Sequence, residues 1–199
     1  SWESKVHAYL ACISYVDSQV GRVLDAIEAS DKADNTIICL LSDHGYHLGE
    51  KSISGKNSLW DRATRVPLIL SAPNLPTGLK NASAVELLDV YPTLAKLANV
   101  NVDAVLDGSP LPLDAELDAT RAAITCSGPY NQAIRTATHR YIRYLDGSEE
   151  LYDYSKDPNE HINLAQDRHY AAIKAQLEAQ LIQNPVMPLP EANSRLSTL

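Results

Sequence analysis

The chain has 199 residues, enough for one large domain or two small ones. Its net charge of −8 disfavours non-specific binding to DNA or to anionic membranes. No apolar run approaches the ~20 residues that span a bilayer, so we expect neither nucleic acid nor a membrane span. The three cysteines lie far apart and match no zinc or disulfide spacing. Cys12 and Cys39 sit in apolar runs, which predicts buried free thiols.

The first 72 residues alternate helical and strand patterns. Apolar residues recur every three or four positions from Val6 to Ile27, which predicts an amphipathic helix ending near Ser30. The apolar runs 36–42 and 66–71 are bounded by turn formers and predict strands buried on both faces, as in a parallel sheet. This order of elements is typical of an α/β domain.

The middle of the chain is richer in loops. Residues 73–84 read as loop, and 86–99 as a helix with Pro92 in its first turn and Asp89 as a candidate N-cap. Residues 101–120 are predicted to form a surface loop.

After residue 120 the period of the pattern changes. Four short segments resemble antiparallel strands: 122–125, 132–137, 141–145 and 150–154. Asp146-Gly147 predicts a hairpin with a type I′ turn. Residues 170–182 predict a helix with Ile173, Leu177 and Leu181 on one stripe, followed by an irregular Pro-rich tail.

A candidate metal site follows the first predicted strand. Asp43 and His44 stand where that strand ends, and ligands bind outside the carboxyl ends of strands in open α/β sheets. Asp43 offers a hard oxygen suited to Ca²⁺ or Mg²⁺, and His44 adds a nitrogen. Gly45 and Gly49 permit the tight or positive-φ backbone path that lets the two side chains reach one cation. Taken alone, the pair is more typical of a capping Asp and a surface His than of a metal site.

A candidate anion-binding lysine follows in Gly55-Lys56-Asn57-Ser58. A Lys beside Gly in a loop can approach an oxyanion as a point charge. The segment is not a phosphate-binding P-loop, since the first Gly of that motif is missing. By itself, Lys56 is also typical of a solvated surface lysine.

Several ordered motifs resemble the sulfatase family. Residues 42–73, SDHGYHLGEKSISGKNSLWDRATRVPLILSAP, resemble its second signature region, closest to the iduronate-2-sulfatase-like branch. The helix-strand unit 9–45, ELLDVYPTLAKLA at 86–98 and RYIRYLDGSEELYDYSKDPNEHINLA at 140–165 also resemble the family. The similarity extends from residue 6 to about residue 182.

The resemblance implies a fold and a site. It implies part of an alkaline-phosphatase-like α/β sheet with helices in 1–120, then a small α+β subdomain with an antiparallel sheet in 121–199. It implies a Ca²⁺, or Mg²⁺, held by Asp43 and His44 with two Asp from an N-terminal part. Lys56 would contact the sulfate group, and Tyr46 and His47 would contact substrate or support the site.

Two departures bear on function. Residues 51–54 read Lys-Ser-Ile-Ser where the family commonly has His-Gly-x-Trp, so the substrate contacts of this loop differ. The family nucleophile, a formylglycine made in a Cys/Ser-x-Pro-x-Arg motif, fits none of the three cysteines. The chain also begins without Met. We therefore expect the nucleophile in an N-terminal part of the same enzyme, or self-association where that part is absent.

Three functions stay open. The first is hydrolysis of a sulfated small molecule or saccharide, with export to the periplasm or outside as in many members of the family. The second is hydrolysis of phosphonate or phosphate esters by a related enzyme. The third is a non-catalytic fragment that binds anions or a partner.

Other polar residues are assigned to structure. Arg62 and Arg65 are expected to brace the loop through carboxylates such as Asp61. The acidic and amide residues of the last hairpin and turn are expected to be scaffold: Asp153, Asp157, Glu160 and Asn163.

Overall fold

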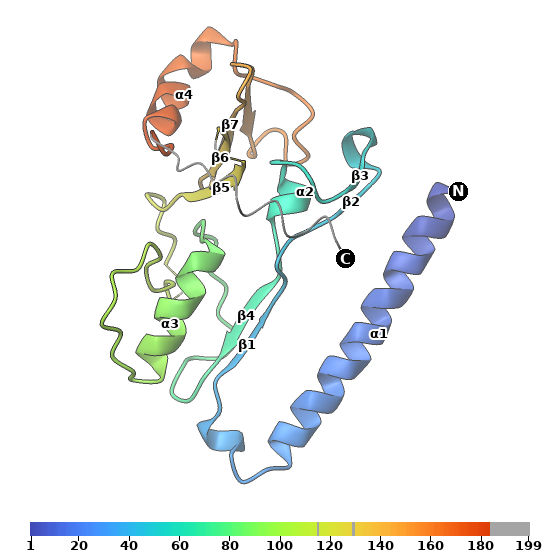
Figure 1. The fold of residues 1–199 in the computed structure, drawn as a ribbon, viewed down its shortest axis with the longest axis vertical. Helices are drawn as coiled ribbons and strands as arrows, with labels where there is room; N and C mark the ends of the chain where they lie inside the picture. The colour runs from blue at the N-terminus through green and yellow to red at the C-terminus, as the bar shows by residue number, and fades with distance from the viewer. Residues whose placement is uncertain (115, 129, 184–199) are drawn as a thin grey trace, which may run out of the picture. The chain divides into compact units, whose positions relative to one another are not determined.

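The computed structural model describes residues 1–114, 116–128 and 130–183, which divide into two compact units. The first unit comprises 1–56, 62–81 and 86–116. The second comprises 57–61, 82–85 and the described part of 117–199. Figure 1 shows the elements in chain order. The Pro-rich tail predicted to be irregular falls on 184–199, outside the described residues.

The predicted first helix is α1, Trp2–Glu28. It begins at Ser1, whose hydroxyl accepts from the amide of Ser4 at 3.3 Å. None of its residues is buried among the described residues, and its apolar stripe is exposed at Leu10, Ile13 and Val16. Cys12 is exposed too, so the expectation of a buried thiol there is wrong. Apolar neighbours in the sequence do not bury a side chain unless another segment packs against them.

The two predicted core strands are β1, Ile38–Leu41, and β4, Leu68–Ser71. They pair antiparallel with each other, with Ile38 opposite Ser71, which corrects the expectation of parallel strands. A run of apolar residues indicates that both faces of a strand are to be buried. It does not indicate whether the neighbouring strand is parallel or antiparallel. Neither strand contains a buried residue among those described, and Cys39 is only half-buried.

Short elements connect these two strands. They are η1 (Ala33–Asn35), β2 (His47–Leu48), η2 (Glu50–Ser52), β3 (Ser54–Gly55) and α2 (Asp61–Thr64). β2 and β3 form a small antiparallel hairpin with His47 opposite Gly55. Its turn holds Lys51 and Ser52 at φ of 54° and 61°. The departure from the family pattern at 51–54 therefore lies on the η2 turn and β3 of this hairpin.

The predicted helix 86–99 consists of η3 (Leu87–Asp89) and α3 (Val90–Leu97), with Pro92 in the first turn of α3. Asp89 occupies the N-cap position of α3 without a side-chain cap bond. Its carboxylate instead accepts from the amides of Glu86 at 3.0 Å and Ser109 at 2.9 Å. Asp89 closes a capping box with Glu86 at the start of η3, the 3₁₀ turn that precedes the helix. Asp89 thereby anchors the loop predicted at 101–120.

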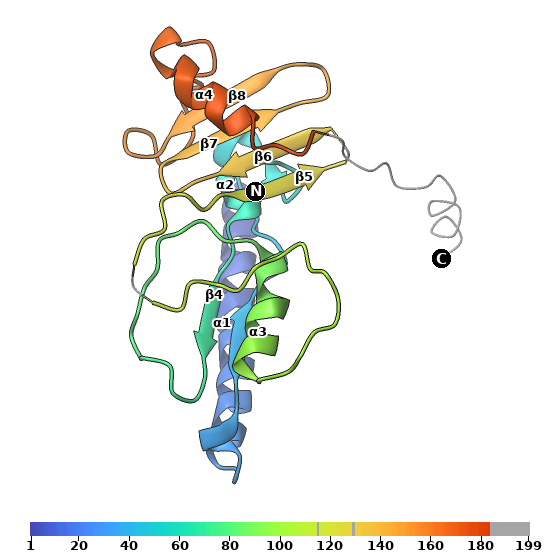
Figure 2. The same cartoon turned by 90° about the vertical axis from the view of Figure 1, so that its left-hand side faces the viewer.

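The second unit contains the predicted antiparallel meander and its closing helix. The strands, in the order β5-β6-β7-β8, are Ala123–Ser127, Asn131–Arg135, His139–Arg143 and Glu149–Asp153. η4 (Arg168–Tyr170) and α4 (Ala171–Glu178) follow. Figure 2 shows α4 lying across the sheet.

The alternation of side chains gives this sheet two apolar faces. One face packs Ile134, Tyr141 and Leu151 against Leu177 and Leu181, with Ile173 partly buried beside them. The three residues predicted as a stripe thus all pack on the sheet, but α4 ends at Glu178, so Leu181 lies beyond the helix and the predicted end at residue 182 is wrong. The opposite face groups Ala133, Ile142 and Tyr152 with Leu59. The second unit therefore has its own core on both sides of the meander.

The hairpin between β7 and β8 differs from its prediction. Gly147 has a φ of 81° and donates to Tyr144 O at 3.1 Å, while Asp146 does not take a positive φ. The turn is therefore not type I′. Asp-Gly also suits a type I turn followed by a glycine bulge, which needs only one positive φ.

No helix among the described residues combines the length and apolarity that crossing a bilayer requires.

Candidate functional site

The candidate site begins in the loop directly after β1. The amide of His44 donates to Asp43 Oδ1 at 3.0 Å, and the hydroxyl of Ser42 donates to His44 O at 2.9 Å. These short-range bonds turn the chain sharply, so that the adjacent carboxylate and imidazole lie on the same side. Asp43 Oδ2 lies 3.5 Å from His44 Nε2.

Gly45 holds this loop against residues that follow Asp61. Its amide donates to Ala63 O at 2.8 Å. A Cβ on Gly45 would lie 2.1 Å from Arg62 O and 2.9 Å from Arg65 O, both backbone atoms that cannot easily move. Glycine is therefore required by this close approach, and the predicted tight path is confirmed at Gly45.

The β2–β3 hairpin brings Lys56 to this loop. Because His47 pairs with Gly55, the residues before β2 and after β3 lie at the same end of the hairpin. Lys56 Nζ lies 2.8 Å from His44 Nε2. Three of the predicted site residues, Asp43, His44 and Lys56, thus meet although 12 positions separate His44 from Lys56.

The imidazole of His44 is oriented as a metal ligand would be. Nδ1 lies 2.8 Å from Gly45 O, and because a carbonyl only accepts, Nδ1 carries the proton. The Lys56 ammonium only donates, so the lone pair of Nε2 faces Lys56, and a cation bound at Nε2 would replace that contact. A backbone carbonyl that fixes the tautomer in this way is a common support for a metal-binding histidine. No cluster of three or more His, Cys, Asp or Glu side chains suited to a metal occurs within the described ranges.

Tyr46 and His47 diverge from each other. The Tyr46 ring is part-exposed and lies 5.4 Å, centroid to centroid, from the ring of Tyr9 on α1. His47 is only 1% exposed, on β2. Burial suits the supporting role that was predicted as one option for His47. Contact of either residue with substrate stays a prediction.

Glu50 and Arg62 also brace the loop. Glu50 Oε2 accepts from the amide of Leu48 at 2.7 Å, and Oε1 lies 3.6 Å from Arg62 Nε. Partial burial raises the pKa of Glu50, but the backbone amides of Glu50 and Leu48 and the charge of Arg62 outweigh it and lower the pKa. Arg62 was expected to brace through carboxylates such as Asp61, and Glu50 was not singled out. No local sequence pattern identifies Glu50, which follows Gly49, as the partner of Arg62.

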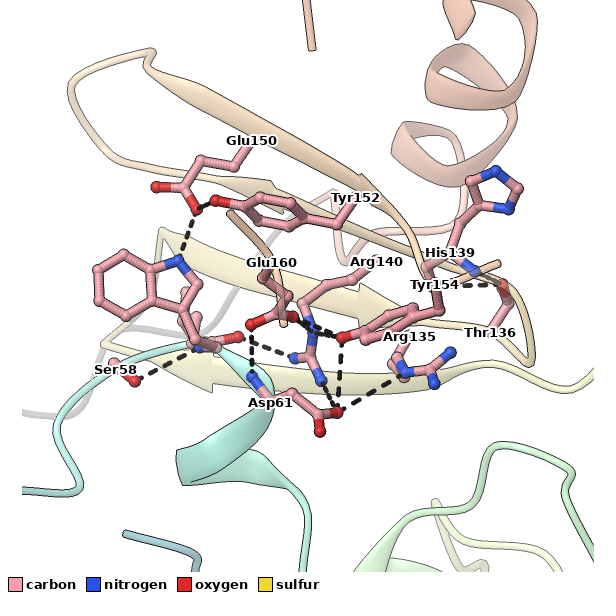
Figure 3. Close-up of polar contacts among 12 residues, drawn as sticks. Ser58, Asp61, Arg135, Thr136, His139, Arg140, Glu150, Tyr152, Tyr154 and Glu160 are labelled. Atoms are coloured by element: carbon pink, nitrogen blue, oxygen red, sulfur yellow. Dashed lines mark hydrogen bonds and ion pairs between the residues drawn. The ribbon is translucent and has the colours of Figure 1, made fainter. Parts of the chain in front are cut away.

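Asp61 belongs to a second group of polar contacts, drawn in Figure 3. It lies 3.2 Å from Arg140 Nη2 and 3.9 Å from Arg135 Nε. The buried Glu160 lies 2.8 Å from Arg140 Nε. Glu160 and its neighbours were predicted to be scaffold, and these contacts confirm that for Glu160.

The other predicted scaffold residues also hold backbone. Asp157 accepts from the amide of Ile162 at 2.7 Å, and Asn163 accepts from the amide of Leu151 at 3.0 Å. The Asp153 carboxylate accepts from the amide of Ser155 at 3.0 Å. Together these bonds fix the turn that follows β8.

Comparisons with known proteins find similar sequences and similar folds. Residues 1–100 match the family model described as Sulfatase. A sulfatase of Formosa agariphila is 44% identical over 181 residues, covering 89% of this chain and 35% of that protein. A structure solved with its substrate D-glucosamine-2-N,6-O-disulfate superposes with a TM-score of 0.71 at 29% identity, covering 86% of this chain and 38% of that one.

One solved structure of another activity is also similar. The phosphonate monoester hydrolase of Agrobacterium radiobacter superposes with a TM-score of 0.71 at 27% identity, covering 89% of this chain and 44% of that one. The chain thus spans about a third of the length of the curated relative and less than half of either solved structure.

Proposed function

Because the chain belongs to the sulfatase family, with its mixed α/β fold, we propose that it forms the C-terminal part of an enzyme that hydrolyses sulfate esters. In this proposal Asp43 and His44 hold a Ca²⁺ or Mg²⁺, and Lys56 faces the sulfate group. The observation that carries it is the meeting of these three side chains, with Lys56 Nζ 2.8 Å from His44 Nε2 and Asp43 Oδ2 3.5 Å from the same nitrogen.

The chemistry of the two ligands supports a cation at this point. The Asp43 carboxylate brings negative charge, and His44 brings a neutral nitrogen held by the Gly45 carbonyl. A bound divalent cation would supply positive charge that stabilises the transferring SO₃ group. Two protein ligands are too few for such an ion, so we propose that an N-terminal region of the same enzyme supplies the others, together with the formylglycine nucleophile.

Lys56 has the charge and reach to act on the anion. Its ammonium lies at the end of a flexible stem that follows Gly55, and the side chain is exposed. In the reaction it would offset the negative charge that develops on the sulfate or bridging oxygen. Preorganised charge of this kind is usually the largest catalytic contribution of an enzyme.

A similar solved structure supports a proposal for the substrate class. A solved structure of similar fold carries D-glucosamine-2-N,6-O-disulfate as its substrate. We propose a sulfated saccharide for this enzyme as well. Membership of the iduronate-2-sulfatase-like branch, expected from residues 42–73, belongs to the same proposal.

Hydrolysis of a phosphonate or phosphate ester is the second candidate. It is favoured by the likeness to the phosphonate monoester hydrolase. The two functions place the same demands on Asp43, His44 and Lys56, because both reactions transfer an anionic group. The two reactions differ in the group that is transferred, and none of the residues described above distinguishes between them.

The test uses the complete enzyme in which these residues would form the C-terminal part. It is assayed with 4-nitrophenyl sulfate and, in parallel, with a 4-nitrophenyl phosphonate ester. A higher kcat/KM for the sulfate supports the proposal, and a higher value for the phosphonate favours the second candidate. Absence of both activities at full metal occupancy would refute a hydrolytic function.

A further inference from the structure

The N-terminal end of α1 contacts the hairpin that follows the candidate site loop. The Trp2 indole donates to the carbonyl of Leu48 on β2. A Cβ on Gly49 would lie 2.6 Å from Trp2 Nε1, so glycine at this position leaves room for the indole. Both elements belong to the first unit, and Figure 1 shows the start of α1 beside β2 and β3. The start of the helix is therefore attached to β2.

Tyr9 makes a second contact from the same face of α1. It follows Trp2 by seven residues, which is about two turns of an α-helix. Its ring lies 5.4 Å, centroid to centroid, from the ring of Tyr46, with 31° between the ring planes. This separation is typical of aromatic rings in contact. The two residues are 37% and 38% exposed, so together they form one partly open aromatic surface, the Tyr9–Tyr46 surface.

The Tyr9–Tyr46 surface starts close to the candidate site. Tyr46 follows His44 by two residues, which limits the distance between their Cα atoms to about 7 Å. Gly45, which lies between them, is fixed by the hydrogen bond from its amide to Ala63 O at 2.8 Å. All of these residues belong to the first unit. A ligand whose anionic group lies at the candidate site can therefore reach the tyrosine rings with its neighbouring atoms.

The chemistry of the Tyr9–Tyr46 surface suits a sugar ring. The face of an aromatic ring is the negative part of its quadrupole, and it attracts the weakly positive C–H groups of a saccharide. A tyrosine hydroxyl can also donate to or accept from a sugar hydroxyl. Aromatic side chains with a few polar groups are typical of sites that bind small molecules.

We propose that Tyr9 and Tyr46 bind the sugar ring of a sulfated saccharide, and that Tyr9 is a specificity-determining residue on α1. The inference rests on the sulfatase function proposed above. It adds a residue of the first helix to a site otherwise built from residues 43–56. A sulfate ester that has no ring gains nothing from the two tyrosines.

The test compares two sulfate esters on the complete enzyme: D-glucosamine-2-N,6-O-disulfate and ethyl sulfate, which has no ring. Tyr9→Leu keeps apolar bulk against Tyr46 and removes the flat aromatic face. It should raise KM for the saccharide about three- to tenfold, the range of one aromatic contact. The kcat should stay unchanged, because binding that is equal in the substrate and the transition state affects KM alone. The kcat/KM for ethyl sulfate should not change.

Two control variants separate stacking from other effects. Tyr9→Phe keeps the ring and should retain the wild-type KM, which distinguishes stacking from a role of the hydroxyl. Tyr15→Leu is the matched control, because Tyr15 is a tyrosine of the same helix that is 67% exposed. Its KM for the saccharide should equal that of the wild type.

Three kinetic results would overturn the proposal. The first is an unchanged saccharide KM in Tyr9→Leu. The second is an equal loss of kcat/KM with the saccharide and with ethyl sulfate, since Tyr9 would then only support the fold of the site. The third is an equal rise of the saccharide KM in Tyr15→Leu.

Fluorine NMR gives a readout that needs neither turnover nor a destabilising variant. Fluorotyrosine is incorporated in place of Tyr9 in the complete enzyme, and its resonance should shift when the disulfate is added and stay in place with ethyl sulfate. A shift without hydrolysis of either ester would refute the sulfatase function and support the sugar-binding surface. An unmoved resonance in excess saccharide would overturn the proposal, whatever the activity.

Discussion

At the scale of single residues, the candidate site consists of groups with different tasks. Asp43 is largely exposed and can offer its carboxylate to a cation, while the His44 tautomer is set by the Gly45 carbonyl. Lys56 carries the only positive charge that the structure brings within hydrogen-bond distance of His44, among the described residues. A cation ligand and an anion-binding ammonium should fail in different ways when removed.

We expect Asp43→Ala in the complete enzyme to lower bound metal and activity together. Lys56→Ala should keep the metal and lower kcat/KM by roughly 10²–10³, or about 2–4 kcal/mol, the scale of an oxyanion donor. Metal content by atomic emission and kcat/KM with an aryl sulfate check both. Lys32→Ala, at an exposed lysine, is the control. Equal loss of metal in the Asp43 and Lys56 variants would contradict these roles.

At the scale of elements, two turns carry most of the local constraint. The loop after β1 is held by the close approach of Gly45 to the Arg62 carbonyl. The turn after β8 is held by Asp153, whose carboxylate accepts from the Ser155 hydroxyl at 2.5 Å and the Tyr170 hydroxyl at 3.0 Å. Gly45 and Asp153 are therefore the residues at which we test these two turns.

Gly45→Ala should break the close contact between the loop after β1 and the backbone of residues 62–65. The added Cβ meets backbone atoms, so we expect a destabilisation of about 1–3 kcal/mol, as for overpacking. Gly21→Ala is the matched control, since nothing lies within 4 Å of its added Cβ and alanine favours a helix by about 1 kcal/mol. Urea unfolding of both variants measures the difference. A Gly45→Ala variant as stable as wild type would refute the close approach.

Asp153 should make the second unit sensitive to acid. The Ser155 hydroxyl, with the Tyr170 hydroxyl and the Ser155 amide, lowers the Asp153 pKa from 3.8 to about 2 against the effect of burial. A depressed folded-state pKa stabilises the fold above the unfolded pKa, and this stability is lost as pH falls from 3.8 toward 2.

The contribution at neutral pH is on the order of 2 kcal/mol. Asp153→Asn should remove this part of the pH dependence of unfolding, measured by denaturant melts between pH 2 and 6. Asp34→Asn, at an exposed residue of η1, is the comparison. Identical pH profiles for wild type and Asp153→Asn would contradict the assignment.

At the scale of the whole molecule, the two units differ in how much apolar surface they cover. The meander buries residues on both of its faces. The first unit leaves apolar side chains exposed on α1 and on the β1–β4 pair, among them Val23, Leu41 and Ile69. Exposed apolar strands favour pairing with another chain.

We therefore expect the 199-residue chain to self-associate through residues 36–72 unless an N-terminal region covers them. Ile69→Lys, on a residue 59% exposed, should reduce association without loss of secondary structure. Ile162→Lys, at an exposed residue of the second unit, is the control. Sedimentation velocity measures both. A monodisperse monomer with a sharp, cooperative melt would show that this surface needs no cover.

The isolated chain should also lack sulfatase turnover, because no cysteine in it fits the nucleophile motif and because the proposed function assigns only two metal ligands to it. An aryl sulfate assay against a heat-treated sample checks this. Turnover above that background, abolished by Lys56→Ala, would contradict the expectation.

The sequence by itself determined the elements whose signals are local. The alternation of the meander and the apolar stripe at α4 each record which face is covered. The three- to four-residue period of α1 predicts the helix, although its apolar stripe is exposed, and Asp43-His44 is a pair of neighbours in the chain. Only the tertiary structure decided the direction of β4, the turn at Gly147 and the Glu50–Arg62 pair. It also decided the hold of Arg140 on Leu59, across 81 positions. A side-chain period reports burial, whereas the partner that provides it is chosen by packing between distant segments, which no local pattern encodes.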